Sequence, residues 1–140
     1  MRAPDYAGPL IGWRVWLVVE RDGGLRLASV VHDELWPAKG ALVARCRRDE
    51  NRFLEPSELA AHAAPHEDCS CGIHAARDPD DVRSYLRGRD EPRTVCRVLG
   101  TVLLWGSVVE CEHGWRASYA YPHHLLLDDP EVERLLAAVA

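Results

Sequence analysis

The sequence predicts an α+β fold whose main element is an antiparallel sheet built from hairpins. Two observations carry this prediction. Residues 12–31 and residues 94–121 each contain two runs rich in β-branched and aromatic residues, separated by a glycine-containing turn signal. Two helix-start patterns, at residues 78–87 and 131–140, follow at separate places rather than alternating with every strand. Such an order favours hairpins with a central and a C-terminal helix over parallel βαβ units.

The first half of the chain is predicted mainly from strand propensity and turn residues. Residues 1–10 contain two prolines and a glycine and are expected to form an irregular lead. Residues 12–20 and 25–31 are expected to pair around the turn Arg21-Asp22-Gly23-Gly24, because glycine tolerates the positive φ of tight hairpins. Two weaker elements follow, a strand at 40–46 and one or two helical turns at 56–62.

The second half is predicted to begin with a short extended piece at 72–75 and a helix at 78–87. Asp78 is the expected cap of this helix, and Pro79 suits its first turn. Strands are predicted at 94–104, 107–112 and 115–121, with a bulge or bend at Gly100 and a kink at Trp105-Gly106. Pro122 is expected to end the last strand, before the closing helix at 131–140.

Bulk properties restrict the class of protein. A chain of 140 residues is expected to form a single domain, 1–140. The formal charge of −5 argues against sequence-independent binding to nucleic acid, which needs a basic face. No apolar run reaches the roughly 20 residues that cross a bilayer, and the first residues do not resemble a signal peptide. We therefore expect no membrane partner and a cytoplasmic location, where structural disulfides are rare.

The most reactive part of the chain is residues 62–74, H-A-A-P-H-E-D-C-S-C-G-I-H. Zinc takes about four thiolate or imidazole ligands in a tetrahedron. Cys69 and Cys71 can supply two ligands from one tight turn, and Cys46 is the natural third. The fourth is a histidine, either His62 or His66, while His74 is a weaker candidate. The alternatives are buried or reactive thiols, and iron in place of zinc; Cys96 and Cys111 are expected in the core.

Two longer patterns, C…H-x-A-P…C-x-C-G-I-H-A and W-G-x-V…G-W-R-A-x-Y-A, frame this region. Their residues are Cys46, His62, Ala64, Pro65, Cys69, Cys71, Gly72, Ile73, His74 and Ala75, then Trp105, Gly106, Val108, Gly114, Trp115, Arg116, Ala117, Tyr119 and Ala120. Together they resemble a family of small actinobacterial proteins of unknown function. The resemblance implies no activity, and it favours His62, in H-x-A-P, over His66 as the ligand.

Five tryptophans in a small domain form the second notable feature. Strand alternation puts Trp115, Ala117, Tyr119 and Tyr121 on one face, and Arg116 on the other, near Glu110 or Glu112. The aromatic face is expected to pack under the two predicted helices. Ala117 would then leave a depression between large rings, with Trp105 or Trp13 as a further wall, where a peptide or small ligand could bind. The simpler interpretation is that these rings are core and rim residues of the sheet.

These observations favour a non-enzymatic module that is stabilised by zinc and binds a protein or small ligand. A closed site with four protein ligands has no open position for a substrate water. The alternative is a metal- or thiol-dependent enzyme that uses the Cys/His loop. No recognised catalytic motif occurs in the sequence, and no catalytic residue is assigned.

Overall fold

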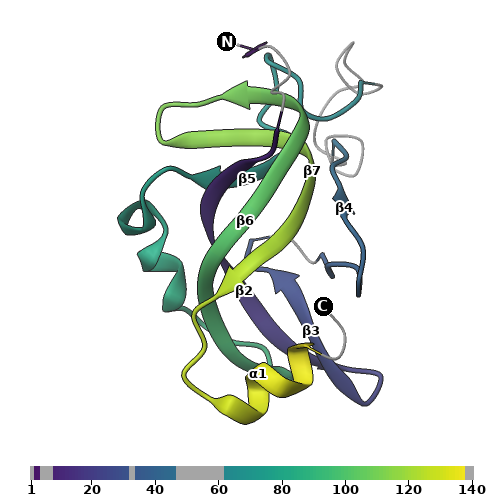
Figure 1. The fold of residues 1–140 in the computed structure, drawn as a ribbon, viewed down its shortest axis with the longest axis vertical. Helices are drawn as coiled ribbons and strands as arrows, with labels where there is room; N and C mark the ends of the chain where they lie inside the picture. The colour runs from purple at the N-terminus through teal and green to yellow at the C-terminus, as the bar shows by residue number, and fades with distance from the viewer. Residues whose placement is uncertain (1, 4–7, 32–33, 47–61, 138–140) are drawn as a thin grey trace.

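The computed structural model describes residues 2–3, 8–31, 34–46 and 62–137. They form one antiparallel sheet of seven strands and a single α-helix (Figure 1). The strands are β1 (Arg2–Ala3), β2 (Leu10–Arg21), β3 (Gly24–Ser29), β4 (Leu42–Val43), β5 (Ile73–Ala76), β6 (Thr94–Glu110) and β7 (Gly114–Leu125). The helix is α1 (Pro130–Ala137). The predicted α+β class with a mainly antiparallel sheet is therefore confirmed.

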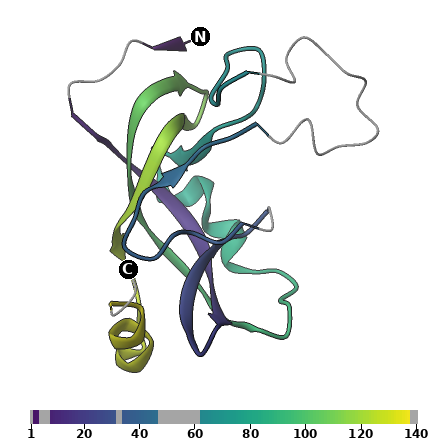
Figure 2. The ribbon, with the colours of Figure 1, turned by 90° about the vertical axis from the view of Figure 1, so that its right-hand side faces the viewer.

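The strands are hydrogen-bonded in the order β1-β6-β2-β5-β7-β4, and β6 also pairs with β7. Strands β6, β2, β5 and β7 therefore close into a ring, and β3 pairs with β2 outside it. Figures 1 and 2 show that the paired strands β6 and β7 curve together as a long two-stranded hairpin. In both views α1 lies at one end of the sheet, and the loop before β5 lies at the other.

Ring closure depends on close approach of β5 to its two neighbours. A Cβ atom added at Gly114 would lie 1.9 Å from the carbonyl oxygen of Ala75, and one added at Gly12 would lie 2.5 Å from the Ala75 Cβ. Larger residues at these two positions would push β5 out of the sheet. The glycines therefore let β5 join β2 to β7, and this brings the segment before β5 against β7.

The core contains side chains from β2, β3, β6, β7 and α1. Trp16 on β2 is fully buried, and its ring meets the ring of Trp36 edge to face with centroids 5.5 Å apart. Val132 and Leu136 of α1 are also buried, against the β3 side of the sheet. Burial of these large apolar side chains supplies most of the driving force for folding.

The first hairpin is confirmed. Arg21 pairs with Gly24, so Asp22 and Gly23 form a two-residue loop, and both have positive φ. The returning strand ends at Ser29, two residues earlier than predicted. The reason is local, because the Ser29 N–H donates to the carbonyl of Glu34 and its hydroxyl accepts from the Trp36 indole. This polar corner replaces further pairing with β2.

The predicted central helix at residues 78–87 is wrong. The segment forms two short 3₁₀ turns, Pro79–Asp81 and Arg83–Leu86. Asp78 does cap the first turn, since its carboxylate accepts from the N–H of Asp80 at 2.9 Å. The two turns instead use i→i+3 hydrogen bonds, from the Val82 N–H to the Pro79 carbonyl and from the Tyr85 N–H to the Val82 carbonyl. Val82, with a φ of −119°, interrupts the helical path between them, and the Arg97 guanidinium on β6 holds the end of the segment through the carbonyls of Tyr85 and Arg87. The predicted C-terminal helix is confirmed within 130–137.

Other boundaries also differ from the sequence predictions. The lead is not wholly irregular, because Arg2–Ala3 pairs with Val109 and Val108 of β6. The strand expected at 40–46 is reduced to Leu42–Val43, and β5 takes residues 73–76. Residues 94–110 form one continuous strand, in which Gly100 packs against the backbone of β7 without a bulge of its own. The helical turns predicted at 56–62 lie outside the described residues, except for His62.

The two irregularities in the β6–β7 ladder explain the remaining differences. A register shift between Trp105 and Val108 confirms the kink predicted at Trp105-Gly106. A second shift, between Thr101 and Val102, lies opposite Pro122. Proline has no N–H to donate and is tolerated at such irregular positions, so β7 continues through Pro122 to Leu125 instead of ending there. No helix in the described ranges is long and apolar enough to span a bilayer.

Candidate metal centre

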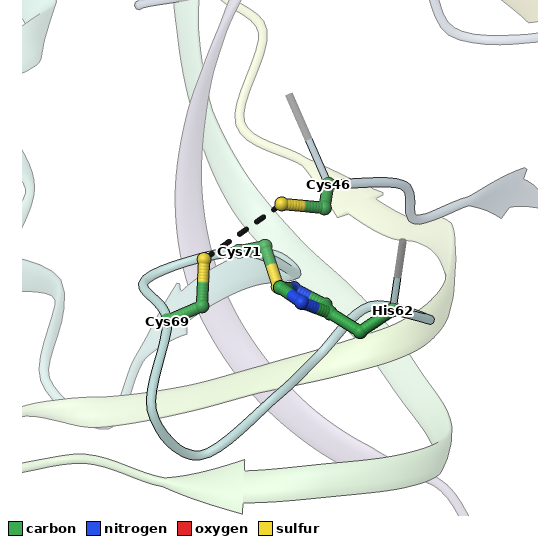
Figure 3. A group of neighbouring side chains, drawn as sticks. All are labelled: Cys46, His62, Cys69 and Cys71. Atoms are coloured by element: carbon green, nitrogen blue, oxygen red, sulfur yellow. Dashed lines mark hydrogen bonds between the residues drawn. The ribbon is translucent and has the colours of Figure 1, made fainter. Parts of the chain in front are cut away.

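Four side chains from separate parts of the chain meet at one end of the sheet (Figure 3). Cys46 follows β4, His62 lies before the loop that leads to β5, and Cys69 and Cys71 lie within that loop. One ligand atom from each residue lies within 4.8 Å of the others, and all four residues are partly buried. The structure therefore brings together the four residues predicted as ligands, and they can hold a metal ion.

The distances fit a tetrahedral ion better than a disulfide. The sulfurs of Cys46 and Cys69 are 3.7 Å apart, well beyond the roughly 2.05 Å of an S–S bond. Nε2 of His62 is 3.3 Å from the sulfur of Cys71. Zinc bound at its usual distances gives tetrahedral edges of about 3.8 Å between two sulfurs and about 3.6 Å between sulfur and nitrogen. The two measured pairs are therefore close to the spacing that a bound ion requires.

The loop that carries the ligands is shaped by Gly72. This residue has a φ of +117°, a conformation that side chains with a Cβ rarely adopt. A Cβ atom there would also lie 2.9 Å from the Cβ of Pro65 and 3.0 Å from that of Arg116. Immediately after Gly72, Ile73 pairs with Ala117 of β7. Gly72 thus turns the loop so that Cys71 faces the cluster while the next residue enters the sheet.

Arg116 of β7 is the functional residue that sequence reasoning missed. Its side chain is buried, with 7% of the residue exposed. Nη1 donates to the carbonyls of His66 at 3.1 Å, Cys71 at 2.7 Å and Cys69. The predicted ion pair with Glu110 or Glu112 is wrong, since Glu110 instead pairs with Arg77 at 2.8 Å. The only sequence signal was alternation, which places Arg116 among the small residues Ser118 and Ala120, where a long side chain has room.

Electrostatics in the cluster disfavour free thiolates. The pKa of Cys71 is raised to about 11, mainly by burial and also by the neighbouring Cys69 and Cys46. Three thiolates so close together repel one another unless a cation lies between them. Nδ1 of His62 is buried and has no hydrogen-bond partner among the described residues, which leaves Nε2 as the atom that faces Cys71.

The reserve ligands lie outside the group of four. The His66 ring lies beside that of His62 at a tilt of 37°, with centroids 4.6 Å apart, and its Nδ1 accepts from the N–H of Asp68. His74 lies on β5, with Nε2 at 2.9 Å from the carbonyl oxygen of Ser70. Cys96 and Cys111 are also outside the group, and both are partly buried rather than enclosed in the core. The cluster therefore has three cysteines and one histidine.

The aromatic residues predicted as ligand-binding candidates are not covered by two helices, because residues 78–87 form short 3₁₀ turns. Tyr119 is 39% exposed, and its ring stacks on Trp105 with centroids 5.9 Å apart. Ala117 is fully buried, and Trp115 carries the Arg77 guanidinium 4.9 Å from its ring centroid. Tyr121 lines a shallow depression together with Trp36 and Leu136. The role of these side chains in binding a ligand stays a prediction, but the expected cover by two helices is wrong.

Comparison of the chain with family models, curated proteins and solved structures gives no match. The resemblance described above therefore stays a prediction, and the functional argument rests on the residues and their geometry.

Proposed function

We propose that the chain is a small domain whose Cys46, His62, Cys69 and Cys71 hold one structural zinc ion. The observation that carries the proposal is the convergence of three thiols and one imidazole at spacings close to tetrahedral edges. Four protein ligands complete the coordination of zinc and leave no position for a substrate water. This donor set therefore favours a structural ion over a catalytic one.

A zinc ion at this place would link the segment after β4, the segment at His62 and the loop before β5, which few strand hydrogen bonds hold together. Cys46 follows a strand of two residues, and His62 comes 16 positions later in the sequence. One ion would tie both to the loop that enters β5. Because the unfolded chain offers no preformed site, the free energy of metal binding contributes directly to folding.

We further propose that the zinc-stabilised domain acts as a binding module for a protein or small ligand in a reducing compartment such as the cytoplasm. The exposed Tyr119 and its stacked partner Trp105 support this proposal, since tyrosine and tryptophan carry much of the binding energy at protein surfaces. The five cysteines form no disulfide in the structure, which suits such a compartment. Tyr119→Ala should weaken binding of a protein or small-molecule partner. Tyr85→Ala, a substitution at a similarly exposed tyrosine, should leave that binding unchanged.

Elemental analysis of protein purified without added metal tests the zinc proposal. We expect one zinc per chain, and we expect Cys69→Ser and Cys71→Ser to lose the metal and to melt at markedly lower temperature. Cys96→Ala is the matched control, because it removes a thiol outside the cluster and should keep the metal. A preparation that is fully folded without metal, or a Cys69→Ser variant that keeps both metal and melting temperature, would overturn the proposal. Iron in place of zinc would correct the identity of the ion but not its ligands.

A further inference from the structure

The loop that carries Cys69 and Cys71 is held by a single buried side chain from another strand. Arg116 lies on β7, more than 40 positions further along the sequence, yet its Nη1 donates to three carbonyl oxygens of this loop. Two of them belong to Cys69 and Cys71 themselves. On its other side Nε of Arg116 donates to the sulfur of Cys111 at 3.4 Å. Arg116 therefore bonds the backbone of Cys69 and Cys71. None of its hydrogen bonds goes to a sulfur or imidazole nitrogen of the cluster.

The charge of the cluster makes this position significant. Three thiolates and one neutral imidazole around a divalent ion leave one net negative charge. A buried net charge is costly unless an opposite charge lies near it. The Arg116 guanidinium is positively charged and is itself buried, so its own charge also needs compensation. The guanidinium and the loaded cluster would form a neutral pair.

We infer that Arg116 is a positioning residue of the metal centre, which holds the ligand loop in place and compensates the negative charge of the loaded site. This inference rests on the proposed metal site. It predicts that the charge of residue 116, and not only its hydrogen bonds, sets the affinity for a divalent ion. It also predicts that Arg116 favours the divalent over the trivalent state of a redox-active ion, because a trivalent ion would leave the ligand set without net charge.

Three variants separate charge from structure. Arg116→Gln removes the charge and keeps amide donors, whereas Arg116→Lys keeps the charge and three donors. Arg77→Gln is the matched control, because Arg77 also makes several hydrogen bonds, to the carbonyls of Cys111 and Glu112 and to Glu110, but none to the ligand loop. Zinc affinity is measured by competition with a chelator of known affinity. Metal-site partners of this kind typically change affinity by about 10- to 100-fold. We expect a loss of that size in Arg116→Gln, a loss below about tenfold in Arg116→Lys, and wild-type affinity in Arg77→Gln.

The second readout is the Fe³⁺/Fe²⁺ midpoint potential of the iron-substituted protein. If Arg116 had only a structural role, its substitution would not shift this potential systematically with the charge of residue 116. Removing a nearby positive charge disfavours the more negative ferrous site, so the potential should fall in Arg116→Gln and stay unchanged in Arg116→Lys and Arg77→Gln. If Arg116→Gln does not fold, Arg116→Lys against wild type decides, since a lysine variant that loses 100-fold or more would exclude charge as the cause.

The outcomes are distinguishable. A wild-type protein that binds no divalent metal contradicts the proposed function itself. A wild-type protein that binds metal, with Arg116→Gln unchanged in affinity and potential, contradicts only the role of Arg116. Equal losses in Arg116→Gln and Arg77→Gln would likewise overturn the inference, because they would indicate a general loss of stability.

Discussion

At the scale of single residues, the backbone conformation of Gly72 sets the path of the loop that carries Cys69 and Cys71. Replacing it with alanine places a Cβ at positive φ and against Pro65 and Arg116. We expect Gly72→Ala to lower the free energy of unfolding by about 1–3 kcal/mol and to weaken metal binding, as measured by chemical denaturation and zinc titration. Gly40→Ala is the control: its added Cβ would make only an ordinary contact, 3.6 Å from Pro37, and should change stability by less than about 0.5 kcal/mol.

Cys96 allows a prediction about pH at the same scale. Burial raises the pKa of this thiol, and the carboxylates of Asp129 and Asp90 raise it further. A raised pKa means that less of the reactive thiolate is present at neutral pH, so alkylation by iodoacetamide should be slow and should accelerate only as pH rises through the shifted value. Mass spectrometry resolved by cysteine, with N-acetylcysteine as reference, measures the profile. An alkylation midpoint at or below that of the reference would contradict the prediction.

The grouping of Cys46, Cys69 and Cys71 with a histidine could be predicted from the sequence, because their chemistry is concentrated in a short run with one upstream cysteine. Arg116 could not. Its contacts with the loop depend on the register in which His74 pairs with Arg116, and this register is set by long-range pairing rather than by local composition. The residues alone likewise could not decide between His62 and His66 as the fourth member, since both histidines flank Pro65.

At the scale of elements, α1 offers the sharpest test of packing. Leu136 is 2% exposed, whereas its neighbour Leu135 is 40% exposed. Leu136→Ala should cost about 2–5 kcal/mol of unfolding free energy, because it leaves a cavity between α1 and the sheet. Leu135→Ala should cost less than about 0.5 kcal/mol in the same denaturation experiment. Similar effects of the two substitutions would show that α1 does not dock on the sheet by this face.

Elements that depend on local interactions were predicted correctly, whereas elements that depend on distant residues were not. The Asp22-Gly23 hairpin was predictable because its turn and register are local. The helix predicted at 78–87 is replaced by two 3₁₀ turns, and the second turn is held through the carbonyls of Tyr85 and Arg87 by Arg97, a residue of a distant strand. The closure of the sheet by β5 was also beyond prediction, since it depends on Gly12 and Gly114 meeting the same short strand from two sides.

At the scale of the whole molecule, the proposed zinc should stabilise one end of the sheet more than the other. The hairpin β2–β3 and helix α1 have their own apolar contacts, including Trp16 with Trp36. Removing metal with a chelator should therefore increase hydrogen exchange first in residues 66–76, while the amides of β2 and β3 keep more of their protection. Uniform loss of protection over the whole chain would show instead that the ion is required for the entire fold. Unchanged exchange at 66–76 would show that the ion does not hold this loop.

X-ray absorption spectroscopy at the metal edge of the purified protein tests the central claim most directly. A zinc ion held by Cys46, His62, Cys69 and Cys71 predicts three sulfur atoms at about 2.3 Å and one nitrogen atom at about 2.0 Å, with no additional oxygen ligand. Any zinc that Cys46→Ser retains should have only two sulfurs in its shell, and the shell of Cys96→Ala should be unchanged. A wild-type shell with fewer than three sulfurs, or with a bound water in place of a protein ligand, would contradict the closed structural site.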